Sequence, residues 1–217
     1  IELQHEPSKE ELKVLFPDLE HALAKAHSTR EGIEAYACWC RTYLREDGEL
    51  VEKNTQLARE IPFPRHPLLV DVANAMRSAF GIDGTTFIPN EVVKKIGRSE
   101  LSKGKHLIKY LDGTWLEYWV LAAFLANQAS HHLHGFAVSL DTHQQNARLD
   151  FEFDVAAMQG YQLYAVSCTR DASKALCKSK LFEAFIRATQ IGGDEARVSL
   201  VCAYPKPESL QREVVEI

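Results

Sequence analysis

Apolar residues recur at intervals of three and four through most of the first hundred positions, which is the spacing of amphipathic helices. This spacing predicts helices at 30–45, 50–59, 66–80 and 88–96. In the helix expected at 30–45, the apolar stripe consists of Ile33, Tyr36, Ala37, Cys40 and Leu44. The pattern therefore predicts a helical N-terminal region.

Local signals at the ends of the 30–45 segment agree with this interpretation. Ser28 followed by Glu31 has the spacing of a capping box, in which two side chains satisfy free N–H groups where a helix begins. Glu46, Asp47 and Gly48 follow the segment and are expected to end the helix.

The pattern changes after residue 112. Residues 116–127 are apolar on nearly all sides, which predicts a helix buried against a sheet. After it, the sequence predicts strands at 132–140, 149–158 and 162–168, a helix at 173–189 and a strand at 197–204. This α-β-β-β-α-β order is typical of an α/β fold. We expect two domains, residues 1–104 and residues 105–217.

The strand expected at 149–158 alternates acidic and apolar residues. Asp150, Glu152 and Asp154 share one face of it, because successive side chains point to opposite sides of a strand. Carboxylates in such a row repel one another and resist burial. Either the row lies at a solvated edge, or a cation neutralises it.

Three sequence features resemble the core of a PD-(D/E)XK nuclease. They are Asp154 in a hairpin, a second strand ending in Ser167-Cys168-Thr169, and the amphipathic helix after it. The segments 113–117, 151–155, 181–184 and 192–197 extend the match over residues 105–205, and together they resemble the nuclease domains of CARF-linked endonucleases, ancillary effectors of type III CRISPR systems. The resemblance implies a restriction-endonuclease-like core, a mixed sheet flanked by helices.

The second strand departs from the family pattern. Members carry Glu-x-Lys on this strand, whereas this chain has Ser167 and Thr169 at those positions. In a rearranged site, Glu183 on the next helix would replace the strand acid. Lys180, one helical turn earlier, would replace the lysine. The alternative is a catalytically inactive nuclease-fold domain that serves nucleic-acid binding or dimerisation.

The resemblance implies hydrolysis of phosphodiester bonds in DNA or RNA with Mg²⁺ or Mn²⁺ held by oxygen ligands. Asp154 would be the central metal ligand and Glu183 would complete the site. The backbone carbonyl of Cys168 would add a neutral oxygen, and Glu117 would hold a metal-bound water or a second ion. Lys180 would orient the attacking water or stabilise charge on the phosphate.

The composition limits the class of protein and the cellular compartment that we expect. A net charge of -5 over 217 residues argues against a generic nucleic-acid coat protein, which is normally basic. Five cysteines without a CxxC pair indicate neither a disulfide framework nor a zinc ribbon, and they suit a reducing cytoplasm. No stretch of the sequence has the length and apolarity of a membrane span.

The resemblance also bears on partners. It implies a nucleic-acid substrate and is compatible with a homodimer. The first residue is Ile1 rather than Met, which leaves room for an upstream cyclic-oligonucleotide-sensing domain, although no such domain is recognisable in these residues. A protein-interaction module built on the helical first half is a third hypothesis.

Overall fold

The computed structural model describes residues 15–126, 131–141, 148–170, 173–204 and 206–215, with the side chains of 125, 131–152, 207, 214 and 215 left aside. The chain divides into two compact units between Trp115 and Leu116. We call Leu15–Trp115 the helical unit and the described residues from Leu116 onward the sheet unit. The sequence placed this boundary after residue 104. None of the helices within the described ranges has the length and apolarity needed to cross a bilayer.

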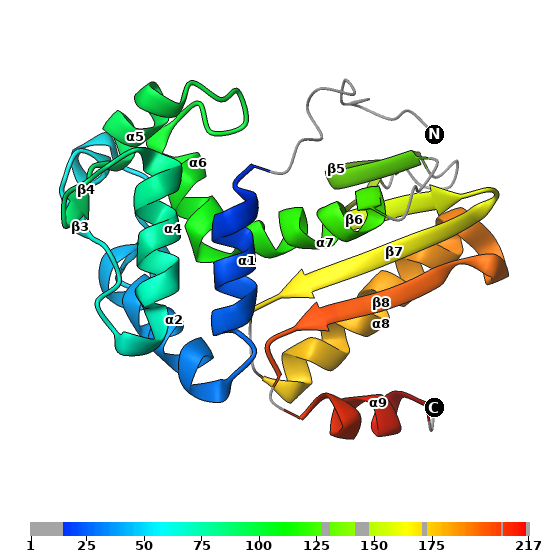
Figure 1. The fold of residues 1–217 in the computed structure, drawn as a ribbon. Helices are drawn as coiled ribbons and strands as arrows, with labels where there is room; N and C mark the ends of the chain where they lie inside the picture. Colours follow the sequence, from blue (N-terminus) through cyan, green and yellow to red (C-terminus); the bar gives the residue numbers. More distant parts are fainter. Residues whose placement is uncertain (1–14, 127–130, 142–147, 171–172, 205, 216–217) are drawn as a thin grey trace. The chain divides into compact units, whose positions relative to one another are not determined.

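The helical unit consists of short helices joined by two-stranded ladders (Figure 1). Its elements are α1 (Pro17–Ala26), α2 (Arg30–Tyr43), β1 (Arg45–Glu46), β2 (Glu49–Leu50), α3 (Asn54–Leu57), β3 (Ile61–Pro62), the 3₁₀ turn η1 (Pro67–Leu69), α4 (Val70–Phe80), β4 (Thr86–Phe87), α5 (Pro89–Ile96), α6 (Gly104–Lys109) and the π-helical turn η2 (Tyr110–Thr114). The expected helices of this region are therefore largely confirmed, but α1 and α6 were not predicted.

The helix expected at 50–59 is wrong in extent, because a hairpin takes its first residues. Asp47 and Gly48 both have positive φ, 52° and 85°, between paired β1 and β2. Two such residues make the tight turn whose twist matches a hairpin, and Asp-Gly is a preferred sequence for it. Leu50 consequently pairs with Arg45, and only the four residues of α3 are helical.

The residue that caps the start of α2 is not the one that the sequence predicted. Thr29, not Ser28, is the N-cap, and its hydroxyl accepts a hydrogen bond from the N–H of Gly32 at 3.1 Å. The hydroxyl of Ser28 instead donates to the carbonyl of Lys25 at 2.7 Å. A Cβ at Gly32 would lie 1.9 Å from the carbonyl oxygen of Ala26, so the turn between α1 and α2 requires glycine there.

The sheet unit has a four-stranded mixed sheet with a helix on each face (Figure 1). Its elements are α7 (Trp115–Ala126, whose first residue belongs to the helical unit), β5 (His131–Asp141), β6 (Arg148–Gln159), β7 (Gln162–Thr169), α8 (Lys174–Gly192), the 3₁₀ turn η3 (Gly193–Glu195), β8 (Arg197–Cys202) and α9 (Pro207–Val215). The strand order is β5-β6-β7-β8, antiparallel except for the parallel pair β7–β8. The expected α-β-β-β-α-β order is confirmed, and α9 is an addition that was not predicted.

The alternation of β7 assigns the two helices to opposite faces of the sheet. Leu163 and Ala165 pack with Ala188 of α8, whereas Tyr164 and Val166 line a pocket with α7. The α7 helix lies against the sheet as expected and buries Val120 and Leu121, but it leaves the apolar side chain of Trp119 40% exposed.

Candidate active site

A small pocket of about 80 Å³ lies between the end of the β6–β7 hairpin and α8. The strands contribute Asp154 and Ser167, and the helix contributes Lys180 and Glu183. The rest of the lining comes from Phe153, Val166, Ala184 and Arg187. The structure thus brings together three of the residues expected from the sequence, Asp154, Lys180 and Glu183, although they are 29 positions apart at most.

Asp154 is positioned by the strand opposite it. Its Oδ2 accepts a hydrogen bond from the hydroxyl of Ser167 at 3.1 Å and from the backbone N–H of Cys168 at 2.6 Å. The β6–β7 pairing ends with Val155 opposite Val166, so this carboxylate takes over the N–H of Cys168 where the ladder stops. One carboxylate oxygen is fixed by these bonds, while Oδ1 has no hydrogen-bond partner among the described residues.

Helix α8 places four of its residues in the pocket because they share one side of the helix. Lys180, Glu183, Ala184 and Arg187 follow one another at intervals that place them on one side of α8. Lys180 is half-buried and Glu183 is exposed. Within the described residues neither side chain makes a hydrogen bond or an ion pair, so both remain free to bind a ligand.

Arg187 is a pocket residue that the site expected from the sequence did not include. Helical spacing in the sequence could have identified it, because Arg187 lies four residues after Glu183 and seven after Lys180 on the same helical stripe. Its guanidinium adds a second cation to the lining, next to two carboxylates.

Glu117 and Cys168 do not line this pocket. The Cys168 thiol is buried, and burial raises its pKa; the nearby carboxylates of Asp154 and Glu117 raise it further, whereas Lys180 lowers it. Glu117 belongs to α7, on the face of the sheet opposite α8. Its role as a holder of water or a second ion stays a prediction, as does the carbonyl ligand from Cys168.

The donor set suits a hard divalent cation. Mg²⁺ is usually bound by one or two carboxylates together with waters and substrate phosphates. Asp154 and Glu183 supply two carboxylates, one with an unbonded oxygen and one exposed. No group of three or more His, Cys, Asp or Glu side chains that could hold a metal occurs in the described part of the chain, so two is what this site offers. The side chains of Asp150 and Glu152 lie outside the described residues.

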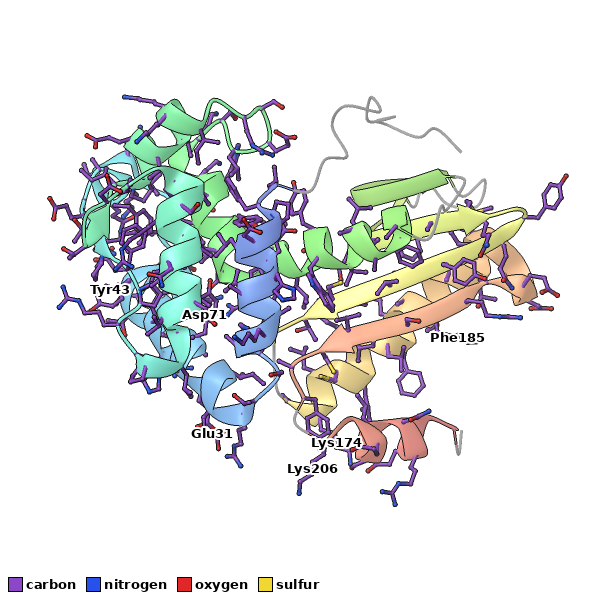
Figure 2. The ribbon with its side chains drawn as sticks, in the orientation of Figure 1. Glu31, Tyr43, Asp71, Lys174, Phe185 and Lys206 are labelled. Carbon is purple, nitrogen blue, oxygen red and sulfur yellow. The ribbon has the colours of Figure 1, made fainter. Side chains whose placement is uncertain are left out.

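Other lysines of α8 are engaged elsewhere. Lys174 and Lys178 both form ion pairs with Glu213 of α9. Lys174, which is labelled in Figure 2, also donates to the hydroxyl of Ser209 at 3.1 Å. These two lysines lower the pKa of Glu213 to about 2. Among the lysines of α8, Lys180 is therefore the one left to the pocket.

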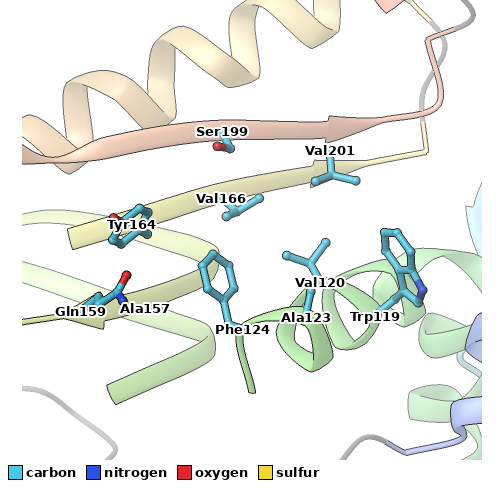
Figure 3. Close-up of a pocket in the computed structure, with 10 residues that line it drawn as sticks. All are labelled: Trp119, Val120, Ala123, Phe124, Ala157, Gln159, Tyr164, Val166, Ser199 and Val201. Atoms are coloured by element: carbon cyan, nitrogen blue, oxygen red, sulfur yellow. The ribbon is translucent and has the colours of Figure 1, made fainter. Parts of the chain in front are cut away.

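A second pocket, of about 400 Å³, lies on the opposite face of the sheet between α7 and strands β6 to β8 (Figure 3). Trp119, Val120 and Phe124 of α7 face Val166 and Val201 across it. The remaining lining residues are Ala123, Ala157, Gln159, Tyr164 and Ser199. None of the described residues that line this pocket is charged, so they offer a bound cation no carboxylate.

Comparison with known proteins shows a likeness in fold. No family model matches the chain, and no curated protein matches it in sequence. The fold is similar to the crystal structure of protein VC1899 from Vibrio cholerae, with a TM-score of 0.57 and 16% identity. The match covers 98% of this chain and 53% of that one, so this chain spans about half the length of that protein. At this identity the likeness concerns the fold alone.

Proposed function

We propose that the protein is a metal-dependent endonuclease of the PD-(D/E)XK class with a rearranged active site. The observation that carries this proposal is that Asp154, Lys180 and Glu183 line one pocket at the end of the β6–β7 hairpin. The mixed sheet flanked by α7 and α8 is compatible with a restriction-endonuclease-like core. The substrate would be DNA or RNA, and the ion Mg²⁺ or Mn²⁺.

The pocket residues have distinct roles in this proposal. Asp154 and Glu183 would hold the ion, and the bonds from Ser167 and Cys168 keep the Asp154 carboxylate in one orientation. When bound, the ion supplies Lewis acidity and lowers the pKa of a water. Lys180 would orient the attacking water, and Arg187 would offset negative charge on the phosphate.

The wider assignment rests on the resemblance of residues 105–205 to CARF-linked endonucleases. On this basis the protein would be a CRISPR-associated ancillary effector in antiviral defence, and a cyclic-oligonucleotide-sensing domain would lie elsewhere in the protein. None of the five cysteines, all of which lie in the described residues, forms a disulfide, which is in keeping with a cytoplasmic setting.

A homodimer is part of the same proposal. Helix α8 carries exposed apolar side chains at helical spacing, Phe182, Phe185 and Ile186, and Phe185 is 55% exposed. Figure 2 shows the ring of Phe185 projecting away from the ribbon. A second copy of the chain would remove this apolar area from water.

A specific observation favours one alternative, a nuclease-fold domain that binds or dimerises without cleaving. Ser167 lies beside Asp154 where the family has a glutamate, and its hydroxyl is already bonded to that aspartate. The lysine position of the motif is Thr169. If Glu183 and Lys180 do not replace these groups, Asp154 is the one metal-binding carboxylate of the family motif that remains in the pocket.

Cleavage assays on short single- and double-stranded DNA and RNA separate the two functions. We expect cleavage in Mg²⁺ or Mn²⁺ and none in EDTA. Glu183→Gln removes one of two anionic ligands and should slow cleavage at least about tenfold. Glu208→Gln on α9 is the matched control and should cleave like the parent chain, because Glu208 is exposed and outside the pocket. Absence of cleavage on every substrate in both metals would favour the inactive domain.

A further inference from the structure

A third pocket, in the helical unit, is basic rather than apolar. It has a volume of about 490 Å³ and lies between the start of α3, helix α5 and the loop that leads into α6. Leu57 and Val93 are its buried apolar residues. The other seven lining residues are polar: Glu52, Asn54, Asn90, Lys94, Ser102, Lys103 and Lys105. We call it the lysine pocket.

The close approach of two helices forms the lysine pocket. Gly104, the first residue of α6, contacts Asn90 in the first turn of α5. A Cβ at Gly104 would lie 2.4 Å from the amide oxygen of Asn90 and 3.2 Å from its backbone nitrogen. A larger residue at position 104 would displace the Asn90 side chain and crowd its backbone, so glycine favours this close approach, in which Lys103 and Lys105 flank the same opening as Lys94.

The polar groups of the lysine pocket have unused hydrogen-bonding capacity. Within the described residues, none of the seven polar side chains makes a hydrogen bond or an ion pair. Three ammonium groups, two amides and a hydroxyl therefore face one opening with a single carboxylate, that of Glu52. Such a donor-rich, cationic lining complements the oxygens of a phosphate group.

The positive charge extends beyond the pocket. Residues 94–109 contain six basic residues, Lys94, Lys95, Arg98, Lys103, Lys105 and Lys109, and one acidic residue, Glu100, in a chain whose net charge is -5. Burial lowers the pKa of His106, near the end of this segment, and the positive charges of Lys105, Lys103 and Lys109 lower it further. The three lysines of the pocket and this local excess of basic residues favour a ligand that carries several phosphates.

We propose that the lysine pocket binds the phosphate groups of a nucleic-acid strand, as a second contact separate from the candidate active site. Contacts of ammonium groups to phosphates position a strand without reading its sequence. No aromatic side chain lines the pocket, so base stacking is not expected to contribute to binding there. The inference does not depend on the proposed hydrolysis, because binding at these lysines involves none of the residues near Asp154.

Fluorescence anisotropy with a fluorescein-labelled single-stranded DNA, and with the matching RNA, tests the proposal in EDTA, where metal-dependent cleavage is stopped. The double variant Lys103→Gln with Lys105→Gln should weaken binding of at least one strand on the order of tenfold. Loss of two phosphate contacts should also reduce the salt dependence, log Kd against log salt, by about 1.4. Glu52→Gln removes the one carboxylate of the lining and should strengthen binding.

The control changes charge by the same amount elsewhere in the helical unit. Arg41→Gln with Arg65→Gln alters two exposed residues outside the pocket and should leave the Kd nearly unchanged. An equal loss of affinity in both double variants, or no loss in the lysine variant, would overturn the proposal. Binding of AMP at these lysines, with no binding of either strand, would overturn the assignment to a nucleic-acid strand. A protein that binds as expected but cleaves nothing would refute the proposed hydrolysis alone.

Discussion

Cleavage by Asp154→Asn is expected to fall at least about 100-fold below that of the parent chain in Mg²⁺ and in Mn²⁺. An asparagine keeps an oxygen that accepts the hydrogen bonds from Ser167 and Cys168, so the end of the β6–β7 hairpin should stay in place. What it loses is the negative charge that a hard divalent ion needs. Initial rates of cleavage at saturating metal measure the effect.

The matched control for this variant is Asp194→Asn. Asp194 is exposed on the turn after α8 and does not line the pocket. The Asp194→Asn variant should cleave at the rate of the parent chain, and the melting temperatures of both variants should be close to that of the parent chain. Undiminished cleavage by Asp154→Asn would remove the pocket from the mechanism, even if the protein proves to be a nuclease.

The largest expected effect on stability lies in the helical unit, at Asp112. Both of its carboxylate oxygens accept hydrogen bonds from Arg45, at 3.2 Å and 2.7 Å, and the carboxylate is nearly buried. Asp112→Ala leaves the guanidinium without this partner, which should lower the free energy of unfolding by about 2 kcal/mol. The loss stays below that of a fully buried pair because the side chain of Arg45 is 36% exposed to water. Urea unfolding measures it.

An exposed pair of the same chemistry provides the comparison. Arg30 and Glu34 are bonded at 2.8 Å, one turn apart on α2, with side chains 73% and 63% exposed. Solvent screens such pairs, so Glu34→Ala should change the free energy of unfolding much less than Asp112→Ala does. Equal effects of the two substitutions would mean that the burial of Asp112 adds nothing to the strength of its bonds with Arg45.

The regular elements of the sheet unit were predictable because their patterns are local. Alternation defined β6, and the helical stripe defined α8, whose end at Gly192 follows from the glycines there. The short β1–β2 hairpin was missed because Asp47-Gly48 also fits the end of a helix. Choosing between a helix end and a hairpin turn requires the partner strand, which single-residue patterns do not give.

The candidate site was predictable in part for a related reason. Helical spacing placed Lys180 and Glu183 on one face of a helix, and the resemblance to the nuclease family singled out Asp154; that Asp154 contacts Ser167 was not predicted. The bond from the Cys168 N–H to Asp154 depends on where the β6–β7 ladder ends, which the sequence does not encode locally. The lysine pocket was missed because it needs α3, α5 and the start of α6 to come together.

The direct test of a shared ion is a crystal of the protein soaked in Mn²⁺, with data collected for anomalous scattering. A peak between the carboxylates of Asp154 and Glu183, at ~2.2 Å from an oxygen of each and absent in Asp154→Asn, is the predicted result. A well-ordered pocket without such a peak, or with the two carboxylates turned away from each other, would contradict it.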